Sequence, residues 1–170
     1  MNRVLIIGGN GSGKSTFAKK LHTITQLPLV HLDRLLWYGH WQTRAQEEFD
    51  TLLQAELEKD CWIIDGNYNR TIPHRLAYCD TVFYFDFSTL RCLWGVTWRV
   101  LSNYGKSRDD MGGNCPERFD LSFYRNILAF NKAHRKDYHA LMEQAKHEGK
   151  SVLVFHNRRQ VKQYLHTIQQ

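Results

Sequence analysis

The sequence predicts an α/β fold in which a parallel β-sheet is covered by helices on both faces. Five short apolar runs alternate along the chain with segments of helical periodicity. Most of these runs are continuously apolar, as in strands that are buried on both faces of a sheet. Alternation of strands and helices is typical of right-handed crossovers between parallel strands. A glycine-rich stretch, GGNGSGKST, joins the first apolar run to the first helical segment.

The expected strands are the five apolar runs themselves. They are RVLIIG (3–8), LPLVHLD (27–33), CWIIDG (61–66), TVFYFDF (81–87) and SVLVFHN (151–157).

Three helices are expected in the first half of the chain. The first begins in the glycine-rich loop and runs through residues 14–24. The second begins at Thr43, where Gln46 completes a capping-box spacing. A short third helix follows Thr71, with Pro73 in the first turn, where a missing N–H does no harm. One face of the second helix carries Phe49, Leu52, Leu53 and Leu57.

Three more helices are expected in the second half. One begins after Ser88, a long one spans 120–146, and the last follows Asn157. The helix after Ser88 carries Leu90, Leu93, Trp94, Thr97, Val100 and Leu101. The last helix is expected to face inward with Val161, Tyr164, Leu165 and Ile168. Between the first two of these helices, the polar, glycine-bearing segment 104–120 lacks periodicity, so we interpret it as a mobile lid.

Composition limits the class of protein. A length of 170 residues fits one domain, 1–170, and no apolar run approaches the ~20 residues that a membrane-spanning helix needs. The start of the chain turns glycine-rich too soon for a secretory signal, so we expect a cytoplasmic protein. The four cysteines have no metal-site spacing and are expected to be reduced thiols. The net charge of +6 suits an acidic ligand without choosing among nucleotide, sugar phosphate and nucleic acid.

The glycine-rich stretch predicts a phosphate site. Gly8, Gly13, Lys14 and Ser15 match the phosphate-loop pattern GxxxxGK(S/T) between a strand and a helix. Glycines let backbone N–H groups point into one cavity, and the following helix adds the positive end of its dipole. Lys14 is expected to reach the β- and γ-phosphates of ATP, and the Ser15 hydroxyl to bind Mg²⁺. The expected nucleotide-binding residues are Gly8, Gly9, Asn10, Gly11, Ser12, Gly13, Lys14, Ser15 and Thr16.

Among phosphate-loop proteins, the sequence favours a small-molecule kinase. No guanine-reading NKxD motif is present, and TVFYFDF offers only Asp86 where large ATPases need an acidic pair. A kinase needs an acidic group at the acceptor, arginines that neutralise phosphate charge and a lid that excludes water. We therefore expect Mg-ATP as the phosphate donor and a small molecule as the acceptor.

Two aspartates end expected strands and so are candidates for the acceptor side. In an open parallel sheet, the carboxyl ends of the strands meet at the ligand crevice. Asp33 is expected to serve as an acceptor ligand or general base, with a helix N-cap as the alternative. Asp65 is expected to hold Mg²⁺ through water or to contact the substrate, with a structural Asp-Gly turn as the alternative. Arg70 is expected to grip a phosphate or carboxylate of the substrate.

Cationic and aromatic side chains complete the predicted site. Arg99, Arg108 and Arg125 flank or lie in the lid, with Lys106 beside them, and together they suit transition-state charge, although each alone also fits a solvated surface residue. Arg158 follows the fifth strand, where it can stack on the nucleotide base or simply occupy the surface. Trp37, just after Asp33, suits an acceptor pocket or the core equally well.

Six motifs resemble the bacterial DNA topology modulation (FlaR-related) proteins over residues 2–165. They read GGNGSGKST, LPLVHLDRLLW, WIIDGNYNRTIPHRL, DTVFYFDFS, RCLWGVTWR and SRDDMGGNCPERFD. The resemblance implies a P-loop NTPase fold similar to that of adenylate kinases, with strand order 2-3-1-4-5. The adenylate-kinase motif DGFPR is matched by DGNYNR, in which Asp65 and Gly66 carry over and the Phe-Pro pair does not. The acceptor is therefore not restricted to a nucleoside monophosphate.

Two hypotheses of function follow. The first is an ATP-dependent small-molecule kinase, which depends on the phosphate loop, Asp33, Asp65 and the lid arginines. The second is a DNA-binding regulator that uses ATP as a ligand, which depends on the positive charge and on the effect on DNA supercoiling that the family name implies. The sequence holds no helix-turn-helix, zinc-finger or RNP signature, so the first hypothesis is favoured. The oligomeric state is left open.

Overall fold

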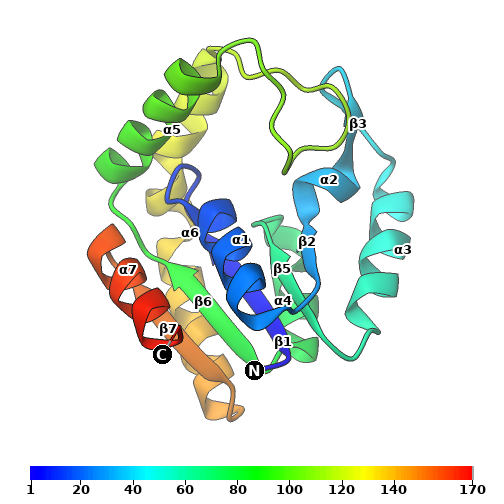
Figure 1. Cartoon of the computed structure of the whole chain (residues 1–170), viewed down its shortest axis with the longest axis vertical. Helices are drawn as coiled ribbons and strands as arrows, with labels where there is room; N and C mark the ends of the chain where they lie inside the picture. Colours follow the sequence, from blue (N-terminus) through cyan, green and yellow to red (C-terminus); the bar gives the residue numbers. More distant parts are fainter. Residues whose placement is uncertain (170) are drawn as a thin grey trace.

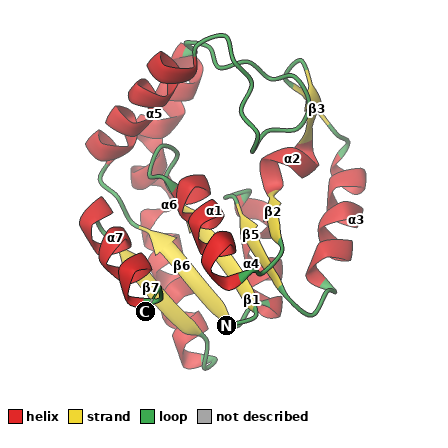
Figure 2. Cartoon of the chain, in the orientation of Figure 1, coloured by secondary structure: helices red, strands yellow, loops and turns green. Residues whose placement is uncertain are grey.

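A five-stranded parallel sheet lies between two layers of helices (Figures 1 and 2). The computed structural model describes residues 1–169, with the backbone alone at position 131. The strand order is β2-β5-β1-β6-β7. When the strands of this sheet are counted in chain order, the order reads 2-3-1-4-5, as predicted. The strands are β1 (Arg3–Gly8), β2 (Leu29–His31), β5 (Trp62–Asp65), β6 (Thr81–Phe85) and β7 (Ser151–Phe155).

The central strand β1 is continuously apolar because both of its faces are covered. Leu5 and Ile7 of β1 belong to the core on one face of the sheet, and Val4 and Ile6 belong to the core on the other. All four side chains are fully buried. Successive strand residues point to opposite faces, so a strand covered on both sides has no position for a polar residue.

The helices begin and end close to the predicted positions, with one exception. They are α1 (Lys14–Thr25), α2 (Leu32–Leu36), α3 (Gln46–Leu57), α4 (Ile72–Tyr78), α5 (Thr89–Asn103), α6 (Leu121–His147) and α7 (Arg158–Thr167). Pro73 occupies the first turn of α4, as predicted. The Asn157 side chain caps α7 by accepting a hydrogen bond from the Gln160 amide.

The prediction that a helix begins at Thr43 is wrong. Thr43 belongs to a small antiparallel hairpin of β3 (Trp37–Gly39) and β4 (Gln42–Thr43), in which it pairs with Trp37. The helix begins at Gln46 instead, after Ala45. The pairing of Thr43 with the neighbouring strand prevails over the helix start that its capping-box spacing predicted. The short helix α2, which precedes the hairpin, was not predicted.

Helix α5 buries only part of the apolar set that its sequence emphasised, since Val100 is buried and Leu93 packs against the core. Cys92, Val96 and Val100 pack into the core. Leu90 and Trp94 are exposed. A conspicuous apolar stripe is therefore left on the outside of this helix.

Segment 104–120, which we call the lid segment, joins α5 to α6 as predicted. It is held together by backbone hydrogen bonds from the Gly105 amide to the Glu117 carbonyl and from the Glu117 amide to the Lys106 carbonyl, 2.9 and 3.0 Å long. Gly112 packs directly on the Trp37 carbonyl. The lid segment thus lies over the hairpin and the start of α2 (Figure 1).

A buried arginine organises the loop that follows β5. Arg75 of α4 is fully buried, and its guanidinium donates to the carbonyls of Gly66 and Tyr68 at 2.8 and 3.3 Å, and also to that of Asn67. Tyr68 has a φ of 37°, which is unfavourable for a residue with a side chain. The guanidinium therefore holds a strained loop in place by satisfying its carbonyls.

We predict that Arg75→Met destabilises the protein by about 3 kcal/mol, because the buried carbonyls of residues 66–68 lose their donors. Urea unfolding followed by circular dichroism measures the change. Arg70→Met is the matched control, since Arg70 is exposed and pairs with Asp50 at the surface. Equal midpoints for the two variants would contradict this role of Arg75.

Candidate functional site

The strand register brings the ends of four strands to one edge of the sheet. Asp65 is level with Ile6 of β1 on one side and with His31 of β2 on the other. Gly8, at the end of β1, is level with Phe85 of β6. The loop after Gly8 and the carboxylate of Asp65 therefore share the crevice that the alternation of strands and helices predicted.

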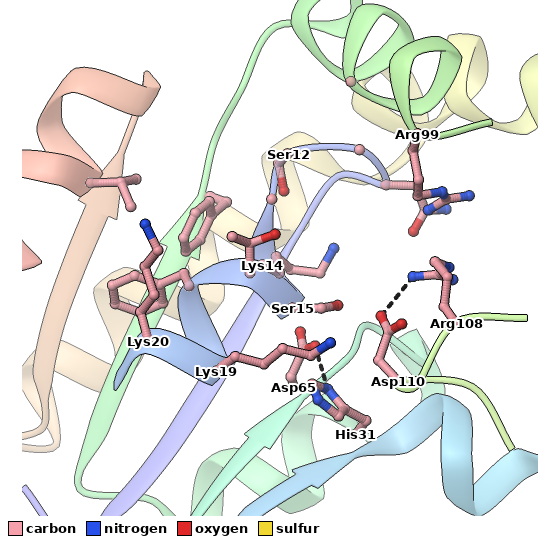
Figure 3. A pocket seen from close by; sticks show the side chains of 18 of the residues that line it. Ser12, Lys14, Ser15, Lys19, Lys20, His31, Asp65, Arg99, Arg108 and Asp110 are labelled. Atoms are coloured by element: carbon pink, nitrogen blue, oxygen red, sulfur yellow. Dashed lines mark hydrogen bonds and ion pairs between the residues drawn. The ribbon is translucent and has the colours of Figure 1, made fainter. Parts of the chain in front are cut away.

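A cavity of about 570 Å³ opens at this edge, beneath the lid segment. Figure 3 shows Lys14, Ser15 and Asp65 around it, with Arg99 and Arg108 entering from the side of α5 and the lid segment. Other lining residues are Asn10, Gly11, Ser12, Gly13, Thr16, Lys19, Lys20, His31, Asp33, Trp98, Asp109, Asp110, Arg158 and Lys162.

The phosphate loop lies against α5 through two glycines. Gly11 has a φ of 82°, and a Cβ there would overlap the Cys92 carbonyl. A Cβ on Gly95 of α5 would overlap the Gly11 carbonyl in turn. Loop and helix therefore lie backbone against backbone at these two glycines, with the side chains of Cys92 and Val96 packed beside them, and this contact fixes the curl of the loop. Gly95 was not recognised in the sequence, because a glycine inside a helical pattern gives no sign of its partner.

Lys14, the first residue of α1, is buried under the loop. Its ammonium donates to the carbonyls of Gly8 and Gly9 at 2.8 and 3.1 Å. Burial lowers the pKa of Lys14, because the charged form is poorly solvated there. A buried ammonium at the start of a helix, where the dipole is positive, is a strong site for an anion.

Two buried oxygen atoms at the cavity have no protein partner. Within the described residues, Ser12 Oγ and Asp65 Oδ1 accept and donate no hydrogen bond. Buried polar atoms without partners are uncommon and cost free energy unless water or a ligand satisfies them. Their position beside Ser15 therefore fits a polar ligand, and the oxygen donors of Ser15 and Asp65 suit Mg²⁺.

Asp65 is fixed by a residue that the sequence interpretation missed. His31 Nδ1 lies 3.0 Å from Asp65 Oδ2, and both side chains are buried. This pair leaves Oδ1 of Asp65, a residue that lines the cavity, without a hydrogen-bond partner among the described residues. His31 was overlooked because its only signal is its place two residues before Asp33, on the strand that neighbours β5.

Asp33 lines the same cavity as the phosphate loop. It is the second residue of α2, whose N-cap is His31, so the alternative role of Asp33 as N-cap is wrong. Tyr68 Oη donates to Asp33 Oδ1 at 2.7 Å. Burial raises the pKa of Asp33, although the tyrosine hydrogen bond acts in the opposite direction. A carboxyl group with a raised pKa is suited to accept a proton.

Arg99 and Arg108 are both held by one acidic residue of the lid segment. Glu117 Oε1 lies 2.9 Å from Arg99 Nε and 2.6 Å from Arg108 Nε, and Glu117 itself is buried. Asp110 binds Arg108 Nη1 at 2.6 Å. Burial, and then the neighbouring charge of Arg108, lowers the pKa of Arg99. The sequence did not predict a role for Glu117 or Asp110, because each is one acidic residue among many polar residues of the loop.

The far end of the cavity lies beside α7. Arg158 lines it together with Lys162 and Trp98. A Cβ on Gly95 would come within 3.0 Å of the Arg158 guanidinium, so Arg158 also lies next to the contact between the loop and α5.

Several predicted site residues do not line the cavity, namely Gly8, Gly9, Trp37, Arg70, Lys106 and Arg125. Arg70 forms two hydrogen bonds with Asp50, 2.6 and 3.0 Å long, and lies in a separate depression between α3 and α4. Arg125 is exposed on α6. Trp37 is partly buried and packs edge-to-face on Trp41, with ring centroids 5.5 Å apart. Arg70 does not reach the crevice at the end of β5, because it lies in the helical turn of residues 69–71.

Comparison with known proteins identifies the fold. No protein-family model matches the chain, and no curated protein matches it in sequence. Among solved structures, shikimate kinase from Bacteroides thetaiotaomicron is similar over 99% of this chain and 96% of its own, with a TM-score of 0.57 and 14% identity. The two chains therefore share one fold, which here is a five-stranded parallel sheet between two layers of helices. Within the described residues, no helix has the length and apolar character to cross a membrane.

We predict that Asp33→Asn raises the stability of the protein at neutral pH. Because the pKa of Asp33 is raised in the folded state, the folded protein keeps a proton that the unfolded chain has lost, and the stability from that proton disappears as the pH rises through the folded pKa. The variant Asp33→Asn is therefore expected to be more stable than the wild type at pH 7. This difference in stability should shrink as the pH falls toward about 4, the ordinary pKa of an aspartate.

Thermal unfolding of the wild type and of Asp33→Asn between these pH values measures this difference. Asp60→Asn, at an exposed aspartate, is the control. A lower melting temperature for Asp33→Asn than for the wild type at pH 7 is the contrary result.

Proposed function

We propose that this protein is an ATP-dependent small-molecule kinase. The observation that carries the proposal is that one cavity is lined by the buried ammonium of Lys14 on the phosphate loop, the carboxyl group of Asp33, and the guanidiniums of Arg99 and Arg108. These are the groups that phosphoryl transfer requires, namely an anion cradle, an acceptor-side acid and positive charge for the transferred phosphate.

The phosphate loop is the donor site of this proposal. Backbone amides of residues 9–14 and the Lys14 ammonium would bind the β- and γ-phosphates of ATP, and Arg158 would lie beside the base. Ser15 and Asp65 would hold Mg²⁺, which neutralises phosphate charge when bound. The free oxygen atoms of Ser12 and Asp65 support a polar ligand at this place.

Asp33 is the acceptor-side group of this proposal. It would accept the proton of an acceptor hydroxyl as the hydroxyl oxygen bonds to the γ-phosphorus and the bond to ADP breaks. Tyr68 would keep the carboxyl group oriented. Arg99 and Arg108 would stabilise the charge on the transferred group, and Glu117 would hold both guanidiniums in reach of it.

The kinase is favoured over a DNA-binding regulator because of where the cations lie. Lys14, Arg99 and Arg108 gather at one cavity, where they suit a small anion. Membership of the DNA topology modulation family stays part of the proposal, on the motifs of the sequence. Binding of duplex DNA at low salt, weakening steeply as salt is added, would instead favour the regulator.

We predict that Lys14→Met weakens the binding of Mg-ATP at least ~10-fold, since the ammonium that faces the phosphates is removed. Isothermal titration calorimetry with a non-hydrolysable ATP analogue measures the affinity. Lys146→Met, an exposed lysine near the end of α6, is the control and should bind as the wild type does. If Lys14→Met binds equally well, the loop is not the nucleotide site.

We predict that Asp33→Asn retains ATP affinity but loses at least ~100-fold in the rate of transfer, because the amide cannot accept the proton. The assay couples ADP release to a panel of hydroxyl-bearing acceptors, chosen first by their thermal stabilisation of the protein with the ATP analogue. Full transfer activity of Asp33→Asn would remove Asp33 from the mechanism.

A further inference from the structure

Large apolar side chains are exposed together on one face of the molecule. Of the ten exposed large hydrophobic residues among those described, eight lie on α5, at the two ends of the lid segment and in the first turns of α6. We call this surface the α5–α6 face. It consists of Leu90, Trp94, Trp98, Leu101, Tyr104, Phe119, Leu121 and Leu128.

The helical spacing makes the α5 part a continuous stripe. Leu90, Trp94 and Leu101 follow one another at intervals of four and seven residues, so they point to the same side of the helix. They are 78, 63 and 71% exposed. The opposite side of α5 packs into the core through Cys92, Val96 and Val100. The exposed stripe therefore makes no part of the core.

The α6 part adjoins this stripe. Tyr124 Oη donates to Thr97 Oγ1 at 3.2 Å, which ties the first turns of α6 to the middle of α5. On α5, Thr97 lies on the side of Leu90 and Leu101; on α6, Tyr124 lies on the side of Leu121 and Leu128. The exposed residues of the two helices therefore meet along one seam, and Figure 1 shows α5 beside α6 below the lid segment.

The area of the face is that of a protein–protein interface. Large side chains bury roughly 150–250 Å² each, so eight that are about two-thirds exposed present about 1,000 Å². The largest apolar patch of an ordinary monomer covers about 300–600 Å². A stable complex buries about 800 Å² on each partner. The α5–α6 face is thus larger than the usual apolar patch of a monomer, and it is large enough for one side of a stable complex.

We propose that a second copy of this chain covers the α5–α6 face in a two-fold symmetric dimer. The area is what a dimer needs, and Leu90, Trp94 and Leu101 form an apolar stripe that can pack on the same stripe of a second copy. Two packed helices on each copy would form a four-helix interface with an aromatic and leucine core, the composition typical of such interfaces. Arg125 lies exposed between Leu121 and Leu128 on the same side of α6, and Lys132 lies exposed one turn after Leu128, where it would belong to the polar rim.

Sedimentation velocity of the full chain over a range of concentrations tests this dimer. The variant Trp94→Glu/Leu101→Glu places two carboxylates in the face and is expected to weaken association at least ~100-fold. Neither residue lines the cavity. The matched control, Ala77→Glu/Ala140→Glu, adds the same charge at exposed helix positions elsewhere and should sediment as the wild type does. Circular dichroism checks that both variants fold.

The expected result is a dimeric wild type and control with a monomeric face variant. A wild type that is monomeric at every concentration overturns the proposal, and so does a face variant that stays dimeric. A monomeric wild type that binds anionic lipid vesicles, with binding lost in the face variant, also overturns it and assigns the face to a membrane surface. None of these readouts uses nucleotide, so they are independent of the kinase proposal.

A second measurement needs no variant. Amide hydrogen exchange of the wild type is compared at low and high protein concentration, and peptides covering α5 and residues 119–128 should become protected as concentration rises. Peptides of α3 and α4 should not change. Protection that is independent of concentration in α5 would contradict the dimer.

Discussion

The contact between the phosphate loop and α5 is the constraint on which the site depends. Gly11 and Gly95 each lie where a Cβ would overlap the backbone of the other element. The loop is thereby pressed between the end of β1 and one helix, and Lys14 is buried beneath its carbonyls. The same helix leads directly into the lid segment, so one backbone contact sets the position of both the anion cradle and the cationic groups that face it.

The cavity combines groups that are costly to bury with partners that hold them in place. Asp33 is held by Tyr68, Asp65 by His31, and Arg99 and Arg108 by Glu117. Burial opposes the charged forms of Asp33, Lys14 and Arg99, as the directions of their pKa shifts show. Such a site lowers the stability of the protein alone and favours a charged ligand that supplies the missing partners.

Most of the fold could be predicted because its signals are local. The apolar runs of the sheet, the loop GGNGSGKST and the helix after Thr71 each depend on adjacent residues. The hairpin around Thr43 could not be predicted, because its pairing competes with an equally good helix-start signal. The role of Gly95 depends on a residue 84 positions earlier, and Glu117 is defined only by the two arginines that converge on it. Arg70 was assigned to the site by its nearness to Asp65 in sequence, whereas the turn at residues 69–71 carries it to another surface.

The central claim is that the backbone amides of the phosphate loop bind the phosphates of a nucleotide. Titration of the ¹⁵N-labelled protein with Mg-ADP, followed by the amide chemical shifts, tests it most directly, because hydrogen bonds to phosphate act on those amides themselves. The account predicts large shifts for Gly11, Gly13 and Lys14, and none around Arg70. Unchanged loop amides at saturating Mg-ADP, or shifts confined to the depression between α3 and α4, would contradict it.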